Sequence, residues 1–136
     1  MERLVVTATT MAVAGALVAL AGCGVSRDSA SAPPRGASAL VVLDTYLRAL
    51  KAGDCATAHA ASAPTFEHGE LCGDVDVSAF SVRADTATPG PNEVVYWTIL
   101  TTNGSSDGTI VRGQTDWFYR LERQGGEWRV SGGSGP

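Results

Sequence analysis

Apolar residues follow different spacings in different parts of this chain. From Leu4 to Leu20 no residue is charged and most are apolar. Between Ser38 and Lys51, apolar residues recur at the spacing of one helix face. They are Leu40, Val42, Leu43, Tyr46, Leu47 and Leu50. After Ser78, apolar and polar residues alternate, which is the period of a strand. The pattern predicts an apolar N-terminal segment, then helices, then a sheet.

The helical part has recognisable ends. Ser38 can cap the start of the long helix, and Gly53 can end it. Asp54 can cap a shorter second helix over Cys55–Ser62, which stops before Pro64. The following loop leads back to Cys72 and to the first strand.

Four strands are expected after this loop. They are Ser78–Thr88, Val94–Thr102, Thr109–Arg123 and a return strand containing Trp128 and Val130, with residues 131–136 as a frayed tail. The third strand should place one set of side chains on a common face: Val111, Thr115, Trp117, Tyr119 and Leu121. Gly125-Gly126 suits the tight turn of a hairpin. Helices followed by an antiparallel meander give an α+β fold, with N-terminal helices packed on a curved antiparallel sheet.

The apolar N-terminal segment ends on a cysteine, in Leu20-Ala21-Gly22-Cys23. These four residues resemble the lipobox of a bacterial lipoprotein. We therefore expect residues 1–22 to be a signal peptide and Cys23 to carry the lipid. An ordinary cleaved signal and a retained membrane anchor are the alternatives. The expected location is the cell membrane, on its extracytoplasmic face.

The remainder divides into a tether, a domain and a tail. Residues 24–36 are small and polar with two prolines, so they are expected to form a flexible tether behind Cys23. The domain should span residues 37–131, with a disordered tail at 132–136. The formal net charge of −4 argues against a nucleic-acid partner and against a polybasic grip on lipid. The membrane contact is therefore assigned to the lipid.

Two cysteines remain after the lipidated one. Cys55 and Cys72 are expected to form a disulfide, because exported proteins fold under oxidising conditions. A zinc site with His59 and His68 and a pair of free thiols are the alternatives. The spacing matches no usual zinc finger, so neither a metal nor another cofactor is expected.

The closing residues, 117–130, combine an aromatic strand, a Gly-Gly turn and Trp-Arg-Val. This stretch resembles the last hairpin of NTF2-like proteins, and the opening pair of helices fits the same family. The resemblance covers residues 38–131. It implies a cone, in which a curved sheet wraps the long helix and leaves an open mouth. It also implies accessory binding domains that often pair through the sheet, so a homodimer is a further expectation.

Some relatives of this kind are enzymes resembling ketosteroid isomerase, which combine a carboxylate base with a tyrosine or acid. The side chains such a site needs, a carboxylate and a tyrosine, are present as Asp116, Tyr96 and Tyr119. Alternation along the strand places Asp116 on the face opposite Trp117 and Tyr119. No catalytic set is identified. Tyr96, Trp117 and Tyr119 are candidates for lining a pocket. The sequence thus predicts a non-catalytic, lipid-anchored module that binds a partner protein or an apolar small molecule. The alternative is a small isomerase-like or dehydratase-like enzyme that uses the cone as its active site.

Overall fold

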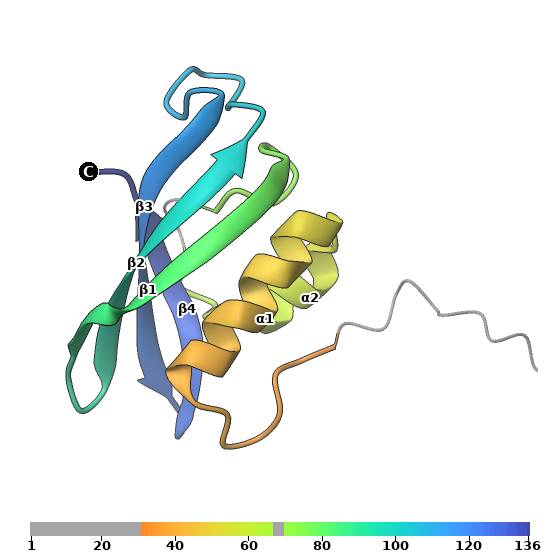
Figure 1. Ribbon diagram of the computed structural model, residues 1–136. Coiled ribbons are helices and arrows are strands. Elements are labelled where there is room, and N and C mark those ends of the chain that lie inside the picture. Colours follow the sequence, from red (N-terminus) through yellow and green to blue (C-terminus); the bar gives the residue numbers. More distant parts are fainter. Residues whose placement is uncertain (1–30, 67–69) are drawn as a thin grey trace, which may run out of the picture.

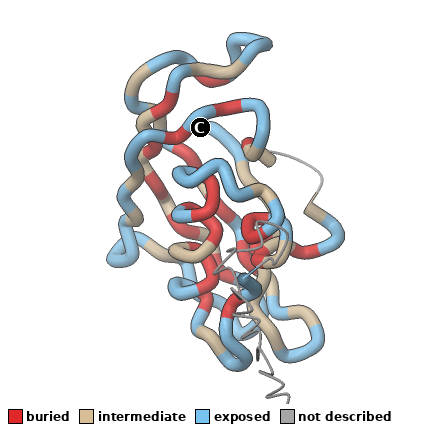
Figure 2. The backbone as a smooth tube through the Cα atoms, turned by 90° about the vertical axis from the view of Figure 1, so that its right-hand side faces the viewer, coloured by how far each residue is buried: buried red, intermediate tan, exposed pale blue. Residues whose placement is uncertain are grey.

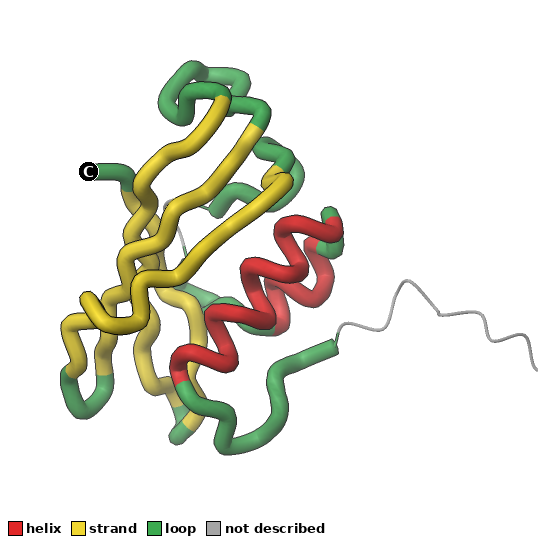
Figure 3. The backbone as a smooth tube through the Cα atoms, viewed as in Figure 1, coloured by secondary structure: helices red, strands yellow, loops and turns green. Residues whose placement is uncertain are grey.

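The computed structural model describes residues 31–66 and 70–136. Two helices come first: α1 (Ala39–Ala52) and α2 (Cys55–Ala60). Four strands follow: β1 (Val77–Pro89), β2 (Glu93–Thr102), β3 (Gly113–Gln124) and β4 (Glu127–Ser134). The strands form one antiparallel sheet in chain order, and both helices lie on one side of it (Figures 1 and 3). The predicted α+β class is confirmed.

Both helix starts have the predicted caps. The Ser38 hydroxyl accepts a hydrogen bond from the Val41 N–H at 3.3 Å. Asp54 accepts from the Thr57 hydroxyl at 2.7 Å and from the Thr57 N–H at 3.1 Å, and these bonds lower the pKa of Asp54. Gly53 ends α1 with φ of 69°, in the left-handed region that glycine enters without steric strain. Local residue chemistry therefore sets these boundaries.

The sheet buries one face against α1. Along β2 every second residue from Val94 to Thr102 is buried, which is the alternation expected of a strand covered on one side. The core is made of α1 and of this inner, concave face; its largest fully buried side chains are Tyr46, Tyr119, Leu43, Leu47, Leu100 and Leu121. Figure 2 shows the buried stretches along the middle of the molecule, with exposed chain at the turns.

Irregular pairing bends the sheet. The register of β1 on β2 shifts between Arg83 and Thr88, and the register of β4 on β3 shifts between Arg120 and Leu121. Extra residues in one strand of a pair kink that strand and increase its twist. The sheet can therefore curve around α1.

Two side chains that the sequence pattern predicts to be buried are exposed, one on α1 and one before β3. Leu40 is 39% exposed, because β1 is the edge strand and the sheet ends beside that part of α1. Val111 is 67% exposed, because β3 begins only at Gly113. The residues before Gly113 form a loop in which the Ser105 N–H donates to the Ile110 carbonyl at 2.9 Å.

The frayed tail predicted after Ser131 is also wrong. Strand β4 continues to Ser134, where Gly132, Gly133 and Ser134 pair with Arg120, Tyr119 and Phe118. Strand pairing uses backbone groups, which glycine carries like any other residue. The absence of apolar side chains therefore did not end the strand.

The end of the expected tether also contacts the domain. The Ser31 N–H donates to the Thr57 hydroxyl at 3.2 Å, and the Gly36 N–H donates to the Glu127 carboxylate at 3.1 Å. Pro33 is buried. Residues 31–36 therefore lie against the domain, because the backbone N–H groups at both ends of this segment form hydrogen bonds to domain side chains. The signal segment, Cys23 and the earlier tether lie outside the described residues. Within residues 31–66 and 70–136, no helix is both long and apolar enough to cross a membrane.

Cys55 and Cys72 form the predicted disulfide, with their Cα atoms 5.6 Å apart. It joins the start of α2 to the loop before β1. Both sulfurs are used in this bond, so they are not available as the thiolate ligands of the alternative zinc site. His59 is exposed on α2, and His68 lies outside the described residues.

We expect replacement of both cysteines by serine to lower the free energy of unfolding by about 3 kcal/mol, because the bond closes a loop with a sequence separation of 17. Urea denaturation of the two proteins measures this difference. Reduction of the unmodified protein should give the same loss. An unchanged unfolding midpoint in both experiments would contradict the expectation.

Candidate functional site

The three pocket candidates share the inner face but differ in depth. Tyr96 and Tyr119 are directly paired across β2 and β3, and Trp117 pairs with Thr98. Tyr119 is fully buried and Trp117 is 6% exposed, so both belong to the core. Tyr96 lines a cleft in the described part of the chain, whereas Trp117 and Tyr119 do not line this cleft.

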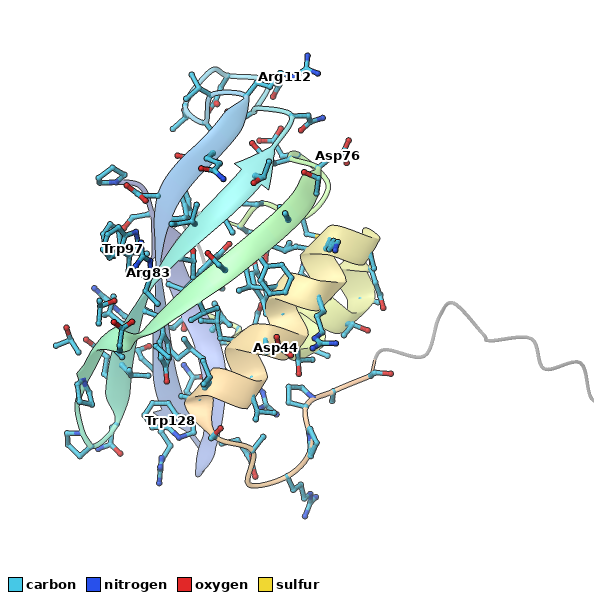
Figure 4. All side chains as sticks on the ribbon, in the orientation of Figure 1. Asp44, Asp76, Arg83, Trp97, Arg112 and Trp128 are labelled. Carbon is cyan, nitrogen blue, oxygen red and sulfur yellow. A yellow bond between two sulfur atoms is a disulfide. The ribbon has the colours of Figure 1, made fainter. Side chains whose placement is uncertain are left out.

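That cleft lies at one end of the sheet, where α1 begins, and is named here the mouth cleft. Its volume is about 460 Å³. Its walls are the start of α1 and the two hairpin turns, and its lining includes Gly36, Ala37, Ser38, Ala39, Pro89, Gly90, Val94, Tyr96, Arg123, Gly126 and Trp128. Figure 4 shows Trp128 at this end of the molecule, beside the first turn of α1.

Arg123 and Trp128 reach the mouth cleft because of the glycine turn. Gly125 and Gly126 both have positive φ, at 58° and 82°, as the two-residue hairpin requires. This turn pairs Arg123 directly with Trp128. The Arg123 guanidinium lies 4.9 Å from the centroid of the Trp128 ring, which is a cation–π contact. Arg123 was missed as a candidate, although its position opposite Trp128 across a Gly-Gly turn was a usable signal.

A second, buried polar cluster lies deeper in the fold. The Tyr46 hydroxyl donates to the Glu70 carboxylate at 2.8 Å, and the Cys72 N–H donates to the same oxygen at 2.8 Å. Tyr119 packs edge-on against Tyr46, with ring centroids 5.4 Å apart. Burial raises the pKa of Tyr46 and of Tyr119, and the Glu70 charge adds to both shifts. These tyrosines are therefore neutral packing residues over the ordinary pH range.

Asp116 lies on the opposite face of the sheet, as the alternation predicts. It accepts a hydrogen bond from the Trp97 indole N–H at 3.0 Å. Trp97 points away from α1 in Figure 4. The structure therefore does not bring Asp116 together with Tyr96 or Tyr119 in one pocket.

An apolar groove runs between α1 and the edge strand β1. It is lined by Leu40 and Val41 from α1 and by Phe80, Val82 and Ala84 from β1, among others, and its volume is about 470 Å³. Val41 is 46% exposed. The groove therefore leaves Leu40, which was predicted to lie on the buried side of α1, 39% exposed.

Comparison with known proteins gives the fold but no sequence family. No family model and no curated protein matches this chain. An NTF2-like protein from Cytophaga hutchinsonii is similar, with a TM-score of 0.54 and 14% identity over 70% of this chain and 91% of that one. A candidate ketosteroid isomerase from Shewanella frigidimarina gives a TM-score of 0.51 and 12% identity over 72% and 94%. This chain has the NTF2-like fold. At sequence identities of 12–14%, the similarity shows the fold alone.

The two central tyrosines of the NTF2-like domain should respond differently to loss of the hydroxyl. The Tyr119 hydroxyl is buried without a hydrogen-bond partner in the described part of the chain, so Tyr119→Phe should change stability by less than about 1 kcal/mol. Tyr46→Phe removes a bond to a carboxylate and should cost about 1.5–3 kcal/mol. Urea denaturation measures both, and equal losses would contradict this assignment.

Proposed function

We propose that this chain is a lipid-anchored protein of the cell envelope whose NTF2-like domain binds a ligand or partner and catalyses no reaction. The lipobox-like Leu20-Ala21-Gly22-Cys23 supports the anchor. The Cys55–Cys72 disulfide supports a location outside the reducing cytosol, where such bonds persist.

One observation carries the non-catalytic assignment: the interior of the cone is filled. Tyr46, Leu47, Leu100 and Tyr119 are fully buried. The opening at the mouth reaches Tyr96, whereas the carboxylate of the deeper cluster, Glu70, borders a separate cleft with His59 and Phe66. A small molecule at the mouth would not meet the Glu70 carboxylate.

The alternative is a small isomerase-like or dehydratase-like enzyme. The similarity to a candidate ketosteroid isomerase and the contact between Glu70 and Tyr46 favour it. Such an enzyme would need substrate beside both Glu70 and Tyr119. A substrate in the cleft that Glu70 borders with His59 and Phe66 would not touch Tyr119, which is fully buried, so binding is the better supported function.

Two surfaces suit binding. The mouth cleft has the size of a small-molecule site, and its walls include apolar side chains. The groove between α1 and β1 exposes Leu40 and Val41, which are apolar side chains of the kind found at protein contacts. We assign the first to an apolar small molecule and the second to a protein partner.

We expect Cys23→Ala to move the protein out of the membrane fraction, because it removes the atom that carries the lipid. Fractionation followed by immunoblotting measures the distribution, and labelled palmitate measures lipid attachment. The control Ser26→Ala should remain on the membrane. A membrane-bound Cys23→Ala protein would instead support a retained anchor, and an unlabelled, soluble unmodified protein would support an ordinary cleaved signal.

We also propose a homodimer through the outer, convex face of the sheet. Both helices lie on the other side (Figure 1), and the half-buried apolar side chains on this face include Val95, Trp97, Ile99 and Phe118. The rings of Trp97 and Phe118 stack at 6.3 Å, and Arg83 lies over Trp97 at 5.0 Å. Charges of both signs flank them, which suits a self-complementary contact.

We expect Trp97→Glu to make the lipid-free domain monomeric at concentrations where the unmodified domain is dimeric, because it places a charge in the apolar centre of the contact. Light scattering measures the mass of each. Val111→Glu, on an exposed loop, is the control and should not change the mass. An unmodified domain that stays monomeric at high concentration would remove the dimer.

A further inference from the structure

Tyr96 places an unpaired hydroxyl in the mouth cleft. The residue is only 8% exposed, yet its hydroxyl has no hydrogen-bond partner in residues 31–66 and 70–136. The Tyr96 oxygen is not among the fully buried unpaired atoms, so part of its surface is accessible, and Tyr96 lines the mouth cleft. Burial raises the pKa of Tyr96, which keeps the hydroxyl a donor.

Arg123 brings a positive charge without an ion pair to the same cleft. Arg48 and Arg120 have carboxylates within 4.0 Å, at Asp44 and Glu93, but Arg123 has none in the described part of the chain. The nearby Glu127 carboxylate accepts from the Gly36 N–H instead. The exposed Arg123 guanidinium lies over the face of the Trp128 ring, a contact that leaves its N–H groups free for an acceptor.

The start of α1 adds to the positive potential. The Ser38 side chain and carbonyl satisfy the N–H groups of Val41 and Val42. The N–H groups of Ala39 and Leu40 have no partner in the described chain, and Ala39 lines the cleft. Free N–H groups at a helix start favour an anion nearby.

The other walls are apolar. Val94, Pro89 and the Trp128 ring face the cleft together with Ala37. A ligand that fills this space therefore needs an apolar body, and its acceptor end must lie near Tyr96 and Arg123.

We propose that the mouth cleft binds small amphipathic carboxylic acids. The carboxylate accepts hydrogen bonds from the Arg123 guanidinium and the Tyr96 hydroxyl, and the apolar body packs on Val94 and Trp128. This inference rests on the proposed binding function and narrows its ligand from any apolar molecule to an acid.

The test uses the full chain in phosphatidylcholine nanodiscs, with empty nanodiscs as the reference titration. The probes are 4-phenylbutyrate and its neutral amide, 4-phenylbutyramide, and calorimetry measures their affinities. The acid should bind about fivefold to tenfold more tightly than the amide, since a charge-assisted hydrogen bond is roughly twice as strong as the neutral bond that the amide oxygen accepts. Arg123→Gln should abolish the preference, and Tyr96→Phe should weaken acid binding by roughly threefold to tenfold.

Arg120→Gln is the matched control, because it removes a charge from the outer face of the same strand and should leave both affinities unchanged. Arg123→Lys keeps the charge and should retain part of the preference, which covers a folding defect of Arg123→Gln. Equal binding of acid and amide, or an Arg123→Gln protein that still prefers the acid, would overturn this inference and leave the binding function standing. No binding of either probe would overturn the inference and the small-molecule part of the proposed function.

Nanodiscs containing oleate distinguish two sources of a carboxylic acid ligand, the membrane and the surrounding solution. Displacement of 4-phenylbutyrate by oleate would identify a fatty acid from the membrane as a ligand. Retained binding would assign the carboxylate site to water-soluble acids.

Discussion

The structure depends on the burial of one side of α1 in a sheet that bends to receive it. Leu43, Tyr46 and Leu47 from the helix meet Leu100 and Tyr119 from the sheet, and all five are fully buried. Burying a side chain of this size contributes roughly 1.5–3 kcal/mol, so this contact outweighs any single polar interaction in the domain. The shifts in strand register supply the bend. The mouth cleft lies beside the first residues of α1, at one end of this buried contact.

Local chemistry made both helix starts and the end of α1 predictable. The end of α2 was not, since the helix stops at Ala60 rather than at the predicted Ser62. Tertiary neighbours decided the other exceptions. Ser38, Gly53 and Asp54 act on the residues next to them, so the sequence predicts their roles correctly. Leu40 follows the helical spacing but lies where the sheet has no further strand, and no local pattern carries that information. The glycine-rich end of β4 looked unstructured because its pairing with β3 depends on backbone groups alone.

The candidate site shows the same division. Alternation along β2 and β3 correctly separates Asp116 from the face of Trp117 and Tyr119. Alternation does not indicate how deeply a side chain is buried, so it could not distinguish Tyr96 at the cleft from Tyr119 in the core. Depth depends on how far each residue lies from the ends of the strands and on what α1 covers. Arg123 became part of the site only because the turn beside it is two residues long.

The sulfur bridge between α2 and the loop before β1 has a consequence for cleavage of the chain. The residues between Cys55 and Cys72 lie in a covalent ring. A protease that cuts one peptide bond inside this ring opens it without releasing a fragment. α1 would then remain joined to the sheet through the sulfurs, and both halves of the core would stay within reach of each other after the nick.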